Sequence, residues 1–297
     1  MEVLLRYIPN DYRFKRKYLD THSGEIETLF LGSSHSFYGI DPVYFHKNTF
    51  NASYNSQSLN YDFEILKKYE NRFENLKTIV IPVSYFTLFG RLEDGPDKWL
   101  IKNYILYFKI NTSKKFCDHT EILSNKFKVN LRRLVSYYIK GIQNSISSDL
   151  GWGTTYKSEN ALDLTETGKE SALRHTRNDI ESAKYTEIFN KNVLELNNII
   201  KWCNNRHVNV ILFTPPAYIT YRMLLNEGQL NTTLNIVNEL DKKYDNCIYV
   251  NLLSDPAFIS RDFYDSDHLS EIGARKLSKI FDDIIIGSGN EPNVSGI

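Results

Sequence analysis

Five short apolar segments, separated by amphipathic helical sequence, limit what this chain can fold into. The first ends in Leu29-Phe30-Leu31, an unbroken apolar run typical of a central parallel strand that is buried on both faces. The clearest helical pattern covers 182–206, where Ile188, Leu196 and Cys203 recur on one face. Strands that alternate with helices predict an α/β fold, a parallel sheet with helices on both faces. The five predicted strands are 26–31, 49–53, 77–83, 208–214 and 247–252.

The segment between residues 90 and 180 interrupts this alternation. Within it, 99–108 and 127–146 have helical patterns without a strand between them. A chain of 297 residues is long enough for two average domains, but α/β folds of this size often form one domain with an insertion. We therefore expect one α/β domain over 1–297, with 90–180 as a mostly helical insertion over the crevice. Residues 287–297, rich in Gly, Ser and Asn, are predicted to be a loose tail.

The composition predicts an ordinary globular protein with no nucleic-acid partner. Hydrophobic residues make up 41% of the chain and charged residues 24%, which is enough for a substantial core. The 36 Lys and Arg residues equal the 36 Asp and Glu residues, which argues against an extended nucleic-acid-binding face. The three cysteines, Cys117, Cys203 and Cys247, are distant from one another and odd in number, so they predict neither a metal site nor a disulfide framework. Cys203 and Cys247 are expected to be buried free thiols.

The N-terminal residues 1–24 are basic and aromatic, and they show no clear period. They lack the apolar core of a signal peptide, and no run in the chain approaches the roughly 18 apolar residues of a membrane-spanning helix. We expect no integral membrane segment and a cytoplasmic location, with 1–24 packed over the sheet or against a partner. The sequence does not indicate an oligomeric state.

The residues after the first predicted strand carry the chemistry. Gly32 allows a sharp turn at the carboxyl end of a strand, where an open α/β sheet places its ligand crevice. Ser34 follows at the position of a nucleophile. A serine needs a base, and the base needs an orienting carboxylate; Asp265 and His268, three apart in one loop, supply both. The alternative interpretation is that Asp265 and His268 belong to a helix N-terminus that starts near Ser270.

Two blocks make the chain resemble a known superfamily. Gly32-Ser33-Ser34-His35-Ser36 after a strand, and Asp265-x-x-His268-Leu269 before a C-terminal helix, are similar to the SGNH/GDSL esterases and acyltransferases, most of all to their bacterial polysaccharide-associated branch. The resemblance spans about 26–281, but these blocks cover only its two ends. It implies a Ser34 nucleophile, a His268 base and an Asp265 acid. It also implies a flavodoxin-like three-layer sandwich, with a five-stranded parallel sheet in the order 2-1-3-4-5.

The resemblance also assigns oxyanion donors, and here the sequence departs from the family. The family has a glycine after the second strand, where Ser53 is nearest and Asn55 follows closely. Any residue except proline still has a backbone N–H to donate, so Ser53 keeps that capacity. The family's third block has an asparagine where this chain has Ser84. We expect Asn55, or failing that Ser84, to face the crevice and supply a side-chain donor.

These features imply a serine-dependent carbohydrate esterase or O-acetyltransferase that acts on a bacterial surface polysaccharide or its precursor. The expected substrate is a carbohydrate or an acylated small molecule. No metal or cofactor is expected, although a transferase would need acetyl-CoA or another acyl donor. One alternative is a non-catalytic SGNH-like protein that binds a glycan or assists its assembly. Another is a metal-dependent phosphoesterase using Asp41, Asp265, Asp267 and His268, although Asp265 and Asp267 are more simply the acid of a triad and a solvated neighbour.

Overall fold

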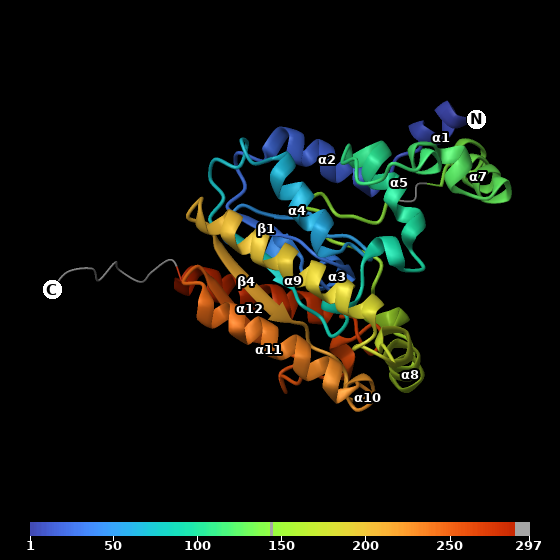
Figure 1. The fold of residues 1–297 in the computed structure, drawn as a ribbon. Coiled ribbons are helices and arrows are strands. Elements are labelled where there is room, and N and C mark those ends of the chain that lie inside the picture. The colour runs from blue at the N-terminus through green and yellow to red at the C-terminus, as the bar shows by residue number, and fades with distance from the viewer. Residues whose placement is uncertain (143–144, 289–297) are drawn as a thin grey trace.

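A computed structural model of the chain describes residues 1–142 and 145–288. Its sheet has five parallel strands in the order β2-β1-β3-β4-β5 (Figure 1), so the predicted α/β fold and strand order are confirmed. Each observed strand falls inside its predicted segment. The strands are β1 Thr28–Phe30, β2 Thr49–Asn51, β3 Thr78–Pro82, β4 Asn209–Thr214 and β5 Cys247–Asn251.

Helices and single helical turns make up most of the remaining structure. The α-helices are α1 Glu2–Tyr7, α2 Asp11–His22, α3 Ser34–Gly39, α4 Leu59–Lys68, α5 Ile101–Asn103, α6 Glu121–Ser124, α7 Phe127–Leu134, α8 Leu164–His175, α9 Ala183–Asn204, α10 Ile219–Arg222, α11 Glu227–Lys243 and α12 Glu271–Ser288. The tighter or wider helical turns are η1 Pro42–Tyr44, η2 Thr87–Phe89, η3 Leu92–Asp94, η4 Lys98–Leu100, η5 Tyr104–Phe108, η6 Phe116–His119, η7 Val135–Ile139, η8 Ser158–Asn160 and η9 Ser260–Asp262. The last helix includes the first two residues of the expected tail, and 289–297 lie outside the described residues.

Residues 1–24 are more regular than their pattern indicated, because they form α1 and α2. The side chain of Asn10 caps α2 by accepting a hydrogen bond from the Arg13 N–H at 3.0 Å. Tyr12, Lys15 and Leu19 form the buried face of this helix. A charged lysine on that face breaks the apolar period, which is why the sequence alone did not reveal the helix.

The strand side chains alternate between two cores. Leu29 and Leu31 belong to the core on one face of the sheet, with side chains from α2, α4, α9 and α11. Phe30 belongs to the other core, where α12 contributes Leu277 and Phe281. Because helices cover both faces, the interior of the sheet has no water-facing side, and polar chemistry is restricted to the strand ends.

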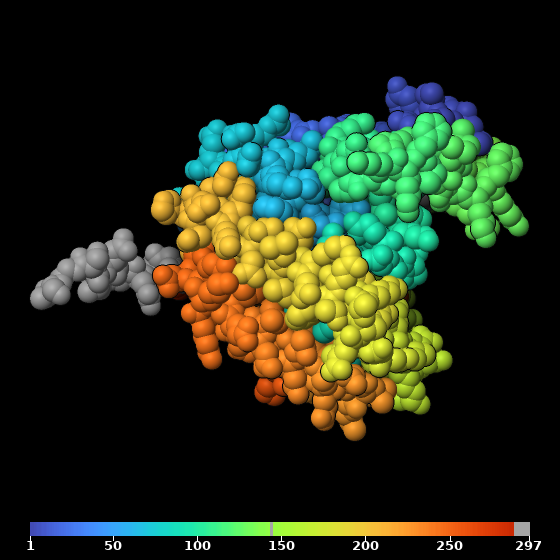
Figure 2. Space-filling view, in the orientation of Figure 1, coloured from blue at the N-terminus to red at the C-terminus, as the bar shows by residue number. Residues whose placement is uncertain are grey.

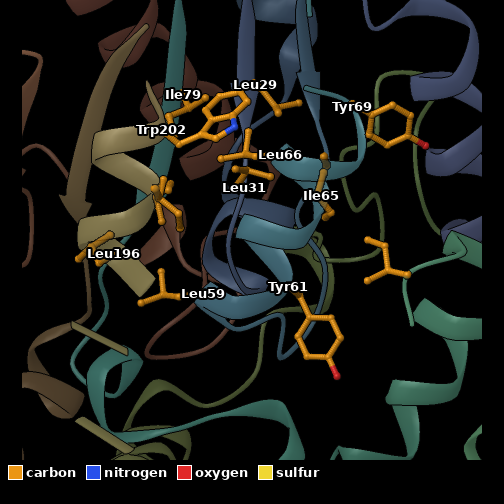
Figure 3. Packing of buried hydrophobic residues seen from close by; sticks show 14 of the residues in the cluster. Leu29, Leu31, Leu59, Tyr61, Ile65, Leu66, Tyr69, Ile79, Leu196 and Trp202 are labelled. Carbon is orange, nitrogen blue, oxygen red and sulfur yellow. The ribbon is translucent and has the colours of Figure 1, made fainter. Parts of the chain in front are cut away.

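The first of these cores is seen from close by in Figure 3. Leu66 of α4 lies next to Leu29 and Leu31, and Trp202 of α9 belongs to the same cluster. These leucines are 0% exposed. Burying one such side chain stabilises a fold by about 1.5–3 kcal/mol, so this contact between α4 and β1 holds the turn that follows β1.

A buried cation joins three distant parts of the chain. The Lys15 ammonium donates hydrogen bonds to the carbonyl oxygens of Asn51 at 2.9 Å and Gly151 at 2.8 Å, and also to that of Ser53. Burial lowers the pKa of Lys15 to about 7. A buried ammonium costs free energy unless its three N–H groups find acceptors. Lys15 therefore fixes the loop after β2 and the Gly151 loop in one arrangement.

Within the 90–180 segment, a second buried charge joins three short helices. Glu121 of α6 is 0% exposed and binds Lys102 of α5 and Arg133 of α7, the latter at 2.6 Å. Burial opposes ionisation of this carboxyl, but Arg133 and Lys102 outweigh it and lower its pKa to about 2. Further along, Trp152 is buried and its indole N–H donates to the Tyr38 carbonyl at 2.7 Å, so this tryptophan anchors its loop in the body.

Two expectations from the composition concern the thiols and the membrane. Cys203 and Cys247 are buried and free, as expected, whereas Cys117 is exposed. No described helix combines the length and the apolar character that crossing a bilayer requires.

The turn at Gly32 gives a testable consequence for stability. Gly32 has a φ of +97°, and an added Cβ would lie 2.4 Å from Cδ of Pro82. We expect Gly32→Ala to lower the free energy of unfolding by about 2–4 kcal/mol, because backbone strain and overpacking act together. Urea unfolding followed by tryptophan fluorescence measures this loss.

Gly141 provides the matched control. Its φ is +67°, and apart from its chain neighbours no atom of the described residues lies within 4 Å of an added Cβ. Gly141→Ala should therefore cost only the strain of the left-handed backbone, about 1 kcal/mol. Equal losses in the two variants would contradict the close approach of Pro82.

Candidate active site

Ser34, His268 and Asp265 meet at the carboxyl end of β1. Ser34 is the first residue of α3, directly after the turn at Gly32, and His268 and Asp265 lie in the loop before α12. Ser34 Oγ is 2.8 Å from His268 Nε2. His268 Nδ1 is 3.0 Å from each carboxylate oxygen of Asp265. The structure thus brings together three residues that are up to 234 positions apart in sequence.

The loop itself orients the acid. One oxygen of Asp265 accepts the backbone N–H groups of Asp267 at 3.0 Å and His268 at 2.8 Å. The spacing of three residues lets one carboxylate bind both the main chain and the imidazole of His268. Burial would raise the pKa of Asp265, but His268 and these hydrogen bonds outweigh it and hold the pKa well below its usual range. The carboxylate is therefore charged and fixed.

Asp267 is buried, whereas the sequence predicted a side chain exposed to solvent. It was predicted to be a solvated neighbour of Asp265, but it is 1% exposed, because α8 of the 90–180 segment packs over it. Ser171 of α8 donates to its Oδ1 at 2.7 Å. Imidazole nitrogens of His268 and His175 lie 3.5 Å from its carboxylate, and that of His35 lies 3.8 Å away. Asp267 is thus a second buried carboxylate next to His268.

These two carboxylates determine the protonation of His268. Burial alone would lower the pKa of this imidazole, but Asp265 and Asp267 stabilise its charged form and raise the pKa above its ordinary value of about 6.5. The Arg174 guanidinium, 3.9 Å from Asp267, opposes this effect. The net result is an imidazole that keeps its proton to a higher pH than a free histidine, so it must lose this proton before it can accept the one of the Ser34 hydroxyl.

Two further histidines lie near the site and are not among the catalytic candidates: His35 of the first block, and His175, which the sequence allowed to line the crevice and which does border the cavity. The ring of His35 stacks on that of His268, with centroids 4.9 Å apart, and its Nδ1 lies 2.8 Å from Ser84 Oγ. Burial, together with His268, lowers the pKa of His35 to about 4. Burial lowers the pKa of His175 to about 3. Both rings are therefore neutral near pH 7. The only sequence signal for His35 was its place directly after Ser34.

The three candidate oxyanion donors differ in what they face. The Ser53 N–H already donates to the Asn51 side chain at 3.1 Å, and Ser53 is 0% exposed. Ser84 is 3% exposed and its hydroxyl contacts His35. Asn55 lies on the cavity wall; its Nδ2 donates to the Tyr38 hydroxyl at 3.2 Å, and its Oδ1 has no hydrogen-bond partner among the described residues. Asn55 is the one of the three that borders the cavity.

A cavity of about 420 Å³ opens beside Ser34 and His268. Its walls come from the loop after β2, from the segment between β3 and α5, and from α8. It has aromatic and cationic parts in addition to the reacting groups. The aromatic and arginine side chains in its wall are Tyr54, Phe86, Trp99, Tyr156, Arg91, Arg174 and Arg177.

The four residues that a metal-dependent phosphoesterase was expected to use do not all lie together. The Asp41 carboxylate caps η1 by accepting the Val43 N–H at 3.2 Å. Among the residues that the structure describes, the one group with metal-ligand proximity is His35, Asp267 and His268, whose donor atoms lie within 4.8 Å of one another. Asp41 is outside that group, because it borders α12 and not the loop of His268.

The electrostatics of His268 can be tested directly. Asp267→Asn removes a negative charge 3.5 Å from the imidazole. The pKa of His268 should then fall by about one pH unit or more, because less charge stabilises the imidazolium. An NMR titration of the histidine ring resonances measures this shift. Ser171→Ala is the control, since it removes a hydrogen bond to Asp267 but keeps the charge; if it lowered the pKa equally, charge would not be the cause.

No protein-family model and no curated protein matches the sequence. Among solved structures, the chain is similar to a proposed platelet activating factor from Streptococcus pneumoniae, with 13% identity, a TM-score of 0.44, and coverage of 92% of this chain and 91% of that one. It is also similar to a proposed acylhydrolase from Bacteroides fragilis, with 10% identity, a TM-score of 0.41, and coverage of 92% and 96%. Similarity at this distance assigns no activity, so function must be argued from the site itself.

Proposed function

We propose that this protein is an SGNH-type serine esterase or O-acyltransferase. The observation that supports this most is the continuous contact from Ser34 Oγ to His268 Nε2, and from His268 Nδ1 to the Asp265 carboxylate. A hydroxyl, an imidazole and a buried carboxylate in this order are what nucleophilic acyl transfer requires. The cavity beside Ser34 provides space for an ester.

The reaction proceeds in two steps. Ser34 Oγ attacks the ester carbonyl carbon while His268 Nε2 takes the hydroxyl proton, and Asp265 orients the ring and stabilises its positive charge. Collapse of the tetrahedral intermediate breaks the bond to the alcohol, which leaves with the proton from His268. An incoming hydroxyl then gives its proton to His268 as it attacks the acyl-enzyme, and His268 returns that proton to Ser34 Oγ as the bond from the acyl carbon to Oγ breaks. Water as acceptor makes the enzyme a hydrolase, and a sugar hydroxyl makes it a transferase.

The developing oxyanion needs donors that are already in place. The Ser34 N–H is in the first turn of α3, where backbone N–H groups have no partner within the helix. The Asn55 amide borders the same cavity and is the second donor in this proposal. The Ser53 N–H and the Ser84 hydroxyl, which were also expected donors, have other partners in this conformation.

The proposed substrate is an acylated carbohydrate, such as a bacterial surface polysaccharide or its precursor. Trp99 is half-exposed at the cavity, whereas the faces of Tyr156 are covered by the stacked rings of Tyr38 and Tyr264, so Trp99 is the aromatic face available to a ligand. Flat aromatic faces suit sugar rings, since they bind apolar C–H surfaces while polar groups bind hydroxyls. A transferase in the cytoplasm, the predicted location, would use acetyl-CoA or another acyl donor.

A second candidate is a glycan-binding or assembly protein with the same fold and no turnover. The occupied Ser53 N–H and the inward-facing Ser84 favour it, because both were expected to stabilise an oxyanion. The two candidates differ in one measurable property, which is covalent reactivity of Ser34.

Ser34→Ala tests the nucleophile. We expect hydrolysis of p-nitrophenyl acetate, in the presence of a chelator, to fall by about 10⁴-fold or more, because the acyl-enzyme cannot form. A fluorophosphonate should label Ser34 in the parent protein and nothing in the variant, as read by mass mapping. Ser33→Ala is the matched control, since the Ser33 hydroxyl has no hydrogen-bond partner in the described structure. An unlabelled but glycan-binding parent protein would favour the second candidate.

Asn55→Ala tests the oxyanion donor. Removing one preorganised donor from an acyl-transfer site lowers kcat by about 10²–10³-fold, so we expect a loss of that size with little change in KM. Ser84→Ala should cost less, because its hydroxyl contacts His35 and not the cavity. The esterase assay on both variants decides the matter; a larger loss in Ser84→Ala would move the donor role to the His35–Ser84 pair.

A further inference from the structure

Exposed apolar side chains gather on one part of the surface. Of the 22 large apolar side chains that are exposed among the described residues, 12 lie in two short segments, 1–7 and 116–142. Phe116, Phe127 and Ile139 are 75%, 66% and 76% exposed. Isolated exposed leucines are common on protein surfaces, but a cluster of large apolar side chains marks an interaction site.

The two segments form one surface, here named the α1–α7 face. The Tyr138 hydroxyl donates to the Leu4 carbonyl at 2.9 Å, and the Glu2 carboxylate accepts the N–H groups of Glu121 and Ile122, each at 2.9 Å. Figures 1 and 2 show α1 beside α7 at one end of the molecule, projecting from the body. The apolar side chains of both segments therefore lie on the same projection.

The interior of this projection is formed around polar and charged groups, and these exposed apolar side chains are not part of it. Its centre is the ionic contact of Glu121 with Lys102 and Arg133, and the side chain of Asn130 is buried beside it and donates to the Glu121 carbonyl. In α7 Asn130 is the one buried residue, while Phe127 on the same helix faces outward. Apolar side chains that lie outside a polar interior indicate that another molecule binds to this apolar face.

The charge of the α1–α7 face indicates what kind of partner binds to it. Exposed basic residues are interleaved with the apolar ones, whereas the acidic residues of 1–7 and 114–142 are Asp118, the Arg6-paired Glu2 and the buried, paired Glu121. The chain as a whole has no net charge, so this positive excess is local. The exposed basic residues are Lys114, Lys115, Lys126, Lys128, Arg132 and Lys140.

An anionic bilayer surface complements this combination. Basic residues bind lipid phosphates while large apolar side chains enter the boundary between headgroups and acyl chains. A second copy of the chain would place like charges opposite one another, which opposes association through this face. We propose that the α1–α7 face docks the protein on the surface of an anionic membrane, with Phe127 and Ile139 inserted and the neighbouring lysines on headgroup phosphates.

Docking would also fix the position of the cavity relative to the bilayer. Leu100 lines the cavity and is followed directly by α5, whose Lys102 binds Glu121 beneath the α1–α7 face. A buried ion pair therefore links the helix next to the cavity wall to the docking face. Docking is independent of whether Ser34 turns over an ester, because it uses none of the residues of the site.

Vesicle co-sedimentation of the full chain tests this proposal. We expect binding to vesicles of equal parts phosphatidylglycerol and phosphatidylcholine, weaker binding as salt is raised, and little binding to phosphatidylcholine alone. The triple change Lys126→Gln, Lys128→Gln, Arg132→Gln should lower the partition coefficient by about two orders of magnitude, since each such charge contributes about a factor of five. Phe127→Ser with Ile139→Ser should also abolish binding.

Matched controls lie elsewhere on the surface. Leu173 and Met223 are 81% and 76% exposed, so Leu173→Ser with Met223→Ser removes comparable apolar surface outside the α1–α7 face and should leave binding unchanged. Circular dichroism checks that every variant keeps its fold. Absence of binding to the anionic vesicles, or an equal loss in the control, would overturn the proposal. So would a dimer, seen by light scattering, that Phe127→Ser with Ile139→Ser dissociates.

Discussion

Burial of the parallel sheet on both faces is the constraint on which the rest of this structure depends. Leu29 and Leu31 face one core and Phe30 faces the other, so β1 offers no side chain to solvent along its length. Polar groups can reach a ligand only where the strand ends. The turn at Gly32, held against Pro82, is that place, and the loop before α12 and the segment between β2 and α4 meet there.

Buried charges then fix the loops that form the site. Lys15 holds the carbonyls of Asn51, Ser53 and Gly151, and Asp267 lies among three imidazoles under α8. A buried charge is costly unless its hydrogen-bonding capacity is used, so each position tolerates little displacement of its partners. The same arrangement that rigidifies the loops makes His268 more basic, which links the packing of α8 to the chemistry proposed for Ser34.

The α/β class and the contact of Ser34 with His268 and Asp265 were predicted from the residues themselves, whereas the strand order came from the resemblance to a known superfamily. Alternating apolar and amphipathic segments predicted the strands, and the Asp-x-x-His spacing predicted one loop that carries both His268 and its carboxylate. The partners of Ser84 and Asn55 were not accessible, because each is a side chain from another element: the Ser84 hydroxyl contacts His35, and the Asn55 amide donates to Tyr38. The Ser53 N–H differs, since it donates to the side chain of Asn51 two residues away, which is local turn chemistry.

The sequence by itself determined the α/β class, the strand ends and the polar residues that follow them, because these depend on short-range periodicity and turn chemistry. Tertiary structure alone decided the environment of those residues. Asp267 looked solvated as a loop residue, yet α8 buries it, and Lys15 looked like part of a basic N-terminus, yet it lies in the interior. Burial and charge pairing arise from contacts between segments that are distant in the chain, so they cannot be predicted from a local sequence pattern.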